Sequence, residues 1–354
     1  MTTGDPGASS PSGRLMAAEV IDQPSVWARI LDEGSQAIES VAAAISSRRP
    51  RFVMLVARGT SDHAALYAKY LVEILLGLPA GLASPSSLTV YGARPDWRDV
   101  LLIGVSQSGG STDLVTTMST GRAQGALTLS ITNNPGSPLD QAAELQLPLR
   151  AGTERAVAAT KSYTAELLTL FLLMDRLSGG DGVSARSLPA WGERVLGSDP
   201  EVRDLAVRYR FAQRLVVTGR GLSYPTAREA ALKLMETSYV SAHAFSGADL
   251  LHGPLAMVEP QVPVLLVLSE GAGGEAMMPV LERLVDQGAD VLCVGAAEAV
   301  ARARVGVVLP SGVPELLQPL IEILPLQQLA LHIARGRGMD PDAPRGLQKV
   351  TRTL

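Results

Sequence analysis

The chain has 354 residues, of which 46% are hydrophobic and 19% are charged, a balance that supplies a sizeable core and excludes a disordered or fibrous protein. Its 31 Lys and Arg against 35 Asp and Glu give a net charge of −4, which is too balanced for a protein that mainly holds nucleic-acid phosphates. A single cysteine, Cys293, excludes disulfides and multi-cysteine zinc sites. No apolar stretch approaches the ~20 residues of a membrane span, and no signal pattern opens the chain. We therefore expect a soluble, cytoplasmic protein with neither nucleic acid nor membrane as a partner.

The first half of the chain alternates short apolar runs with helical patterns. Residues 1–15, which are rich in Thr, Gly, Ser and Pro, predict a disordered leader. Apolar residues then follow at helical spacing as far as about residue 45. Apolar strands are predicted at residues 52–57, 100–105 and 126–131, and a long helix at residues 158–177. Continuous apolar strands between helices indicate a parallel sheet that is covered on both faces.

The second half repeats this pattern. Strands are predicted at residues 214–218, 262–268 and 290–294, and the Arg-Gly-x-Ser sequence of residues 58–61 recurs about 160 residues later. A repeat of that length indicates a duplicated domain. The sequence thus predicts an α/β protein with a first domain over residues 16–185, a second over residues 186–338, and a tail over residues 339–354.

Residues 106–111, Ser-Gln-Ser-Gly-Gly-Ser, lie where a predicted strand ends and a helix begins. Unpaired backbone N–H groups and the helix dipole favour an anion at such a position, and the glycines let a phosphate approach the backbone. The loop is neither a Walker motif nor a dinucleotide fingerprint. It predicts a phosphate site, with an ordinary capped loop as the alternative. The matching loop at residues 269–275 carries two glutamates, so we expect a single anion site in each chain, in the first half.

The predicted helix at residues 225–240 is apolar around most of its surface but carries three charges, Glu229, Lys233 and Glu236. At 100° per residue, these three lie within an arc of about 60°. The arc is either a surface stripe of i, i+4 pairs or a group that faces a cavity, where a Glu can move a proton and a Lys can hold an oxyanion. The apolar surroundings favour the cavity.

His252 follows in a Leu-His-Gly-Pro sequence, where a proton shuttle and a simple turn residue are both open interpretations. The other histidines show no ligand spacing, so we expect neither a metal ion nor any other cofactor.

Six segments of the chain, taken in order, resemble the double sugar-isomerase (SIS) domain proteins. This family includes the isomerase half of glucosamine-6-phosphate synthase and the type II glucosamine-6-phosphate deaminases. The matching segments are residues 58–61, 106–109, 157–161, 231–236, 251–254 and 344–351. The resemblance implies two tandem SIS domains, each a parallel sheet flanked by helices on both faces.

The resemblance also implies roles for individual residues. Glu236 would move a proton between C1 and C2 of a sugar, supported by Glu229 and Lys233, and Lys349 would close over the sugar. His252 would catalyse ring opening from the neighbouring subunit of a homodimer. The residues implied to bind the phosphosugar are Thr60, Ser61, Ser106, Gln107, Ser108, Ser111, Val157 and Ala159.

Departures from the synthase pattern bear on the substrate. Gly110 stands where the synthase has an acid, Ala159 where it has a serine, and Met235 where a lysine is common. Small residues near the sugar could make room for an N-acyl group. The only thiol, Cys293, lies in a predicted buried strand, which speaks against glutamine-dependent synthesis.

A single carboxylate base could serve three reactions on an open-chain phosphosugar, namely isomerisation, deamination and dehydration. The preferred reaction is the deaminating isomerisation of glucosamine 6-phosphate to fructose 6-phosphate and ammonia. The alternatives are a dehydratase or isomerase that acts on N-acetylglucosamine 6-phosphate or a related phosphosugar, and a phosphosugar sensor without catalysis.

Overall fold

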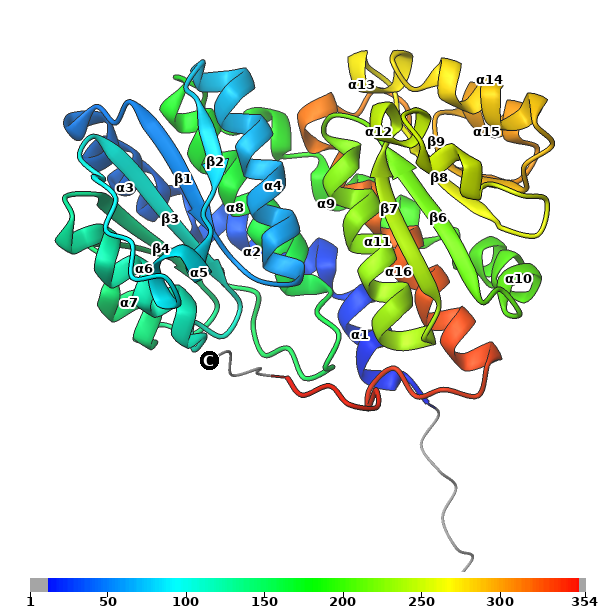
Figure 1. Ribbon diagram of the computed structural model, residues 1–354, viewed down its shortest axis with the longest axis horizontal. Helices are drawn as coiled ribbons and strands as arrows, with labels where there is room; N and C mark the ends of the chain where they lie inside the picture. The colour runs from blue at the N-terminus through cyan, green and yellow to red at the C-terminus, as the bar shows by residue number, and fades with distance from the viewer. Residues whose placement is uncertain (1–11, 350–354) are drawn as a thin grey trace, which may run out of the picture.

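The computed structural model describes residues 12–349, and these form two parallel five-stranded sheets side by side (Figure 1). In sheet A the strand order is β2-β1-β3-β4-β5, and in sheet B it is β10-β9-β8-β6-β7. Read from β7, sheet B repeats the order of sheet A strand for strand. The duplication predicted from the sequence is therefore present in the topology, and the α/β class with two parallel sheets is confirmed.

The first half opens with three helices and then builds sheet A. Its helices are α1 (Arg14–Ile21), α2 (Gln23–Glu33), α3 (Ser35–Arg48), α4 (Thr60–Leu71), α5 (Pro85–Thr89), α6 (Thr112–Ala123), α7 (Pro138–Ala142) and α8 (Lys161–Leu177). Its strands are β1 (Phe52–Val56), β2 (Ala80–Leu82), β3 (Val100–Ser106), β4 (Leu127–Thr132) and β5 (Leu145–Pro148). Most of the predicted leader lies outside the described residues, and α1 already begins at Arg14.

The second half builds sheet B and ends in a long buried helix. Its strands are β6 (Arg214–Gly219), β7 (Ser241–Ser246), β8 (Val264–Leu268), β9 (Val291–Gly295) and β10 (Gly306–Val308). Its helices are α9 (Leu188–Leu196), α10 (Asp199–Tyr209), α11 (Ser223–Ser238), α12 (Gly247–Leu251), α13 (Ala272–Glu275), α14 (Met278–Asp286), α15 (Ala297–Ala303) and α16 (Gln318–Gly336). Among residues 12–349, no helix combines the length and apolar character needed to cross a bilayer.

The strands place alternate side chains on opposite faces of each sheet. In β1, Val53 and Leu55 join a core that runs through both halves, whereas Val56 faces a separate cluster under α5, α6 and α7. In sheet B, Leu265 and Val267 join the shared core, whereas Cys293 faces α14 and α15. The two inner faces thus share one continuous core that contains α4, α8, α11 and α16.

The domain interface sets the geometry of the site. Helices α4 and α11 pack against each other across it, and they lie side by side at the centre of Figure 1. After α16 the chain runs back beneath both halves towards the first one (Figure 1). Residues from both domains and from the tail can therefore meet at one place.

Candidate active site

A cavity of about 320 Å³ lies where the loops after β1 and β3 meet. The strand order of sheet A reverses between these two strands, and open α/β sheets bind ligands at such a switch point. The cavity is lined by all of the predicted substrate-binding residues, which are Thr60, Ser61, Ser106, Gln107, Ser108, Ser111, Val157 and Ala159. Arg58, Gly59 and the tail residue Lys349 complete the lining.

The loop after β3 is a tight turn held by its own hydroxyls. Ser106 Oγ accepts a hydrogen bond from the Gly109 N–H at 3.1 Å, and Ser108 Oγ accepts one from the Gly110 N–H at 3.3 Å. Gly109 has φ +63°, and a Cβ there would lie 2.2 Å from Ser137 Oγ. The turn therefore needs glycine at this position, which explains the Ser-Gly composition of the loop.

Arg58 brings a positive charge to the rim of the cavity. Its Nε donates to Asp113 Oδ2 at 2.7 Å, and the side chain is still 46% exposed while that of Asp113 is 3% exposed. A buried carboxylate thus orients a guanidinium whose other nitrogens can meet an anion.

The three charges on α11 pair with one another at the domain interface, and none of them lines the 320 Å³ cavity. Lys233 Nζ lies 2.5 Å from Glu236 Oε2 and 3.3 Å from Glu229 Oε1. Lys233 and Glu229 are fully buried, while the Glu236 side chain remains 22% exposed. Burial alone would lower the pKa of Lys233, but the two carboxylates outweigh it and raise that pKa above its ordinary value. The two carboxylates therefore favour the protonated form of Lys233, which lies beside the partly accessible Glu236.

Thr60 joins this cluster to the cavity. Its hydroxyl donates to Glu229 Oε1 at 3.1 Å and accepts from Lys233 Nζ at 3.0 Å, and Thr60 also lines the cavity. The side chain of Thr60 thus joins the cavity of the first half to the charged helix α11 of the second half.

Lys349 reaches the cavity from the tail. Its Nζ donates to Glu154 Oε2 at 2.8 Å and to the Ala156 carbonyl at 2.6 Å. Burial would raise the pKa of Glu154, but Lys349 and the N–H groups of Ser162 and Thr160 outweigh it and lower that pKa. The ion pair fixes this end of the tail to the first half.

A second contact holds the tail to the second half. The N–H of Arg345 donates to the Tyr239 hydroxyl at 2.8 Å, and its guanidinium lies 4.3 Å from the centre of the Tyr239 ring. Tyr239 caps the C-terminal end of α11, the helix that carries Glu236.

His252 lies apart from these residues. It follows α12 on an exposed segment and does not line the 320 Å³ cavity. Within residues 12–349, its ring makes no hydrogen bond or ion pair, and its backbone N–H donates to the Asp249 carbonyl at 3.0 Å. This chain alone therefore does not bring His252 to the site.

The corresponding loop of the second half holds internal carboxylates. Glu315 accepts from the N–H groups of Gly273 at 2.8 Å and Ala272 at 3.1 Å, and Ser269 Oγ donates to Glu322 at 2.6 Å. The backbone donors that could face a phosphate are thus occupied by Glu315, a residue that the sequence reasoning did not identify.

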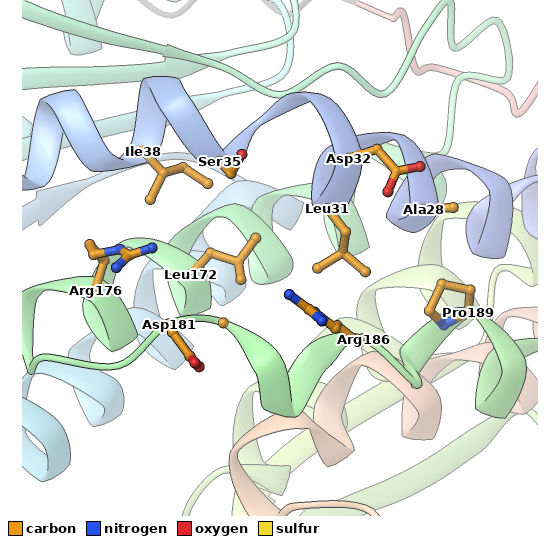
Figure 2. Close-up of a pocket in the computed structure, with 11 residues that line it drawn as sticks. Ala28, Leu31, Asp32, Ser35, Ile38, Leu172, Arg176, Asp181, Arg186 and Pro189 are labelled. Atoms are coloured by element: carbon orange, nitrogen blue, oxygen red, sulfur yellow. The ribbon is translucent and has the colours of Figure 1, made fainter.

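A larger cavity of about 600 Å³ lies elsewhere, and none of the predicted residues lines it. Figure 2 shows Leu31 and Asp32 on α2, Ile38 on α3, and Leu172 and Arg176 on α8 around this space. Size alone therefore does not locate the site, because the strand-end loop lines the smaller cavity and Thr60 joins that cavity to the charged helix.

Three further polar residues of the site were missed by the sequence reasoning. Arg58 was part of a matching segment, and its charge beside Gly-Thr-Ser at a strand end was an available signal. His63, three residues after Thr60, bonds Glu229, and Glu154 bonds Lys349. Nothing local in the sequence indicates the last two contacts, since their partners lie 166 and 195 positions away.

Comparison with protein families finds two copies of one domain. The family model described as "SIS domain" matches residues 48–175 and 209–334. The chain is 33% identical to glutamine–fructose-6-phosphate aminotransferase (isomerizing) of Halobacterium salinarum over 98% of its length, and 34% identical to that of Thermococcus kodakarensis over 95%. It spans 60% and 57% of those proteins, so it corresponds to part of each.

Solved structures give the same fold. A protein of Silicibacter pomeroyi DSS-3, named as a candidate phosphosugar isomerase, has 34% identity and a TM-score of 0.84, covering 93% of this chain and 99% of that one. The C-terminal domain of glucosamine-fructose-6-phosphate aminotransferase from Francisella tularensis has 24% identity and a TM-score of 0.79, covering 97% and 100%. At this lower identity the likeness shows the fold alone.

Proposed function

The chain belongs to the SIS-domain family, and on that premise we propose that it converts glucosamine 6-phosphate to fructose 6-phosphate and ammonia. The observation that carries the proposal is the double role of Thr60, which lines the anion cavity and bonds both Glu229 and Lys233. A small molecule whose anionic group is held at residues 106–111 can thereby also meet a carboxylate of α11.

The phosphate of the substrate is held by the hydroxyls and N–H groups of the loop after β3. Arg58 and Lys349 are the cations that line the same cavity. Charge-assisted hydrogen bonds from a guanidinium are roughly twice as strong as neutral ones, so Arg58 favours a phosphorylated sugar over a neutral one. The relatives support this class, since the aminotransferases act on fructose 6-phosphate by name.

The reaction needs one base and one cation. Glu236 takes the C2 proton of the open-chain amino aldehyde, and the electrons of that C–H bond form an enolamine while Lys233 stabilises the charge on the C1 oxygen. Return of the proton to C1 gives a C2 imine, and water then hydrolyses the imine to the ketone and ammonia. Lys233 suits its role because the adjacent carboxylates keep it protonated.

A second candidate reaction acts on an N-acetylated sugar phosphate. Ala159 lines the cavity and Gly110 lies in the loop after β3, and two residues this small would leave room for a substituent on the nitrogen. Glu236 would again take a proton next to the carbonyl, and loss of the C3 hydroxyl would give dehydration, or return of the proton to C1 isomerisation.

We also propose that the active form is a homodimer. Exposed apolar side chains of Leu251 and Met257 lie on either side of His252, on α12 and the turn that follows, and Met235 is exposed on α11. A second copy packed on this surface would bury them and could bring its own His252 to the site, where it would open the sugar ring.

The test is product analysis with two substrates. Purified protein is incubated with glucosamine 6-phosphate and, separately, with N-acetylglucosamine 6-phosphate, and ammonia, fructose 6-phosphate and new ultraviolet absorbance are measured. We expect ammonia and fructose 6-phosphate in equal amounts from the first substrate. Absorbance or isomer formation from the second substrate alone would favour the second candidate.

The control is Glu236→Gln, which keeps the shape of the side chain and removes the base. We expect it to bind phosphosugars and to lose turnover by on the order of 10²–10⁴-fold. Binding without turnover in the unmodified protein would instead indicate a phosphosugar sensor.

A further inference from the structure

His63 makes a buried contact between the two halves of the chain. It lies in the first turn of α4, and its Nδ1 is 2.8 Å from Glu229 Oε2 on α11. The side chains are 8% and 0% exposed. Because a carboxylate accepts hydrogen bonds, this contact assigns the ring proton to Nδ1.

The two oxygens of Glu229 have different partners. Oε1 accepts from Thr60 Oγ1 and faces Lys233 Nζ, whereas Oε2 bonds His63. Without the imidazole, Oε2 would be a buried acceptor with no partner, and leaving such a group unpaired is unfavourable. The carboxylate would be free to rotate away from Lys233.

We propose that His63 is a positioning residue for the proton-transfer step, acting through Glu229 and Lys233 on Glu236. The inference rests on the proposed function of the site. The contacts run in series, from His63 to Glu229, from Glu229 to Lys233 at 3.3 Å, and from Lys233 to Glu236 at 2.5 Å. Each member of the series fixes the next, and only Glu236 is partly exposed.

His63 acts at a distance from the substrate. It does not line the 320 Å³ cavity, so it contributes neither to phosphate binding nor directly to the reacting atoms. Loss of its hydrogen bond should therefore lower kcat and leave KM for the phosphosugar unchanged. A misplacement of about 1 Å in a reacting group can cost on the order of 10²-fold in rate.

The experiment compares His63→Asn with His63→Gln. The amide nitrogen of Asn overlays Nδ1 and keeps the donor to Glu229, whereas that of Gln overlays Nε2 and does not. The readout is the formation of fructose 6-phosphate from glucosamine 6-phosphate, measured as kcat and KM. We expect the Asn variant to stay near the unmodified rate and the Gln variant to fall by on the order of 10²-fold at constant KM. His243→Gln, at an exposed position of β7, is the matched control, and we expect its rate to be unchanged.

The outcomes separate this inference from the function. Absence of turnover in the unmodified protein would overturn the proposed function itself. Turnover in the unmodified protein with an equally fast Gln variant would overturn the role of His63 and leave the function standing. Equal losses in the Asn and Gln variants, with a raised KM or a lowered melting temperature in both, would show that His63 only supports the fold.

Discussion

Lys233 Nζ donates a 3.0 Å hydrogen bond to Thr60 Oγ1, although the two residues are 173 positions apart and lie in different halves of the chain. The same hydroxyl donates to Glu229 Oε1. One threonine thus couples the anion cavity to the ion cluster on α11.

Replacing Thr60 tests this coupling. Thr60→Val removes the hydroxyl at nearly constant shape, so Lys233 loses an acceptor and Glu229 a donor. We expect kcat to fall by about 10–100-fold, the equivalent of one hydrogen bond to a charged group at about 1.5–3 kcal/mol. Thr60→Ser keeps the hydroxyl and should retain most of the activity. The measurement is the steady-state kcat of both variants. A Val variant with the kcat of the unmodified protein would contradict the coupling.

Arg58 should determine how tightly a phosphorylated substrate binds. We expect Arg58→Gln to raise KM for glucosamine 6-phosphate by about 10–100-fold, the equivalent of one charge-assisted hydrogen bond, with little change in kcat. Arg58→Lys should restore only part of the affinity, because an ammonium cannot donate to Asp113 and to the phosphate with the same geometry. Equal KM values for all three proteins would exclude a phosphate contact.

The Glu154–Lys349 ion pair predicts a pH-dependent attachment of the tail. The pKa of Glu154 is lowered in the folded protein, so the pair contributes stability above the ordinary glutamate value of 4.5. That contribution is lost as the pH falls through the lowered pKa. Limited proteolysis should therefore cleave the tail faster at acid pH, and Glu154→Gln should show the fast cleavage already at pH 7. A cleavage rate that changes neither with pH nor in the Glu154→Gln variant would contradict the attachment.

Glu166 predicts a stability effect of the opposite sign. Burial raises its pKa well above 4.5, and the Ser61 hydroxyl at 2.8 Å only partly opposes this. The folded state therefore binds a proton that the unfolded state releases, and the free energy of unfolding falls as the pH rises above 4.5. Glu166→Gln has no carboxyl group that could ionise at this position. We therefore expect the melting temperature of the variant minus that of the unmodified protein to be larger at pH 8 than at pH 5, by at least about 2 °C. A pH-independent difference would contradict a protonated Glu166.

Mixed dimers test the place of His252. If His252 serves the partner's site, a mixture of Glu236→Gln and His252→Ala proteins contains hybrids with one complete site. Random exchange of subunits between dimers with twofold symmetry would then restore about a quarter of the unmodified activity. Each variant alone should be nearly inactive in an assay that starts from the ring form. Mixtures as inactive as their components would place His252 outside the partner's site.

The parts of the site that depend on local sequence could be predicted. The loop at residues 106–111 follows a buried strand, and the three charges of α11 share an arc that helix geometry fixes within two turns. Both patterns were visible without knowledge of the neighbouring elements.

The contacts between distant segments could not be predicted. His63 meets Glu229 only because α4 packs on α11, and Glu154 meets Lys349 only because the tail returns to the first half. The short strands β2 and β10 have three residues each, and β7 is a polar Ser-Ala-His-Ala-Phe-Ser sequence, so their pairing comes from the sheet rather than from periodicity.

Glu315 has a consequence for how the protein responds to its ligand. A carboxylate attached to the same chain has a high effective concentration at its site, in the millimolar range or above, and it does not diffuse away. Its hydrogen bonds to Ala272 and Gly273 therefore occupy two backbone donors of the second loop and compete there with any phosphosugar. Saturation curves should accordingly follow a single hyperbola with a stoichiometry of one per chain, in which the second half contributes the charges of α11 and no second phosphate loop.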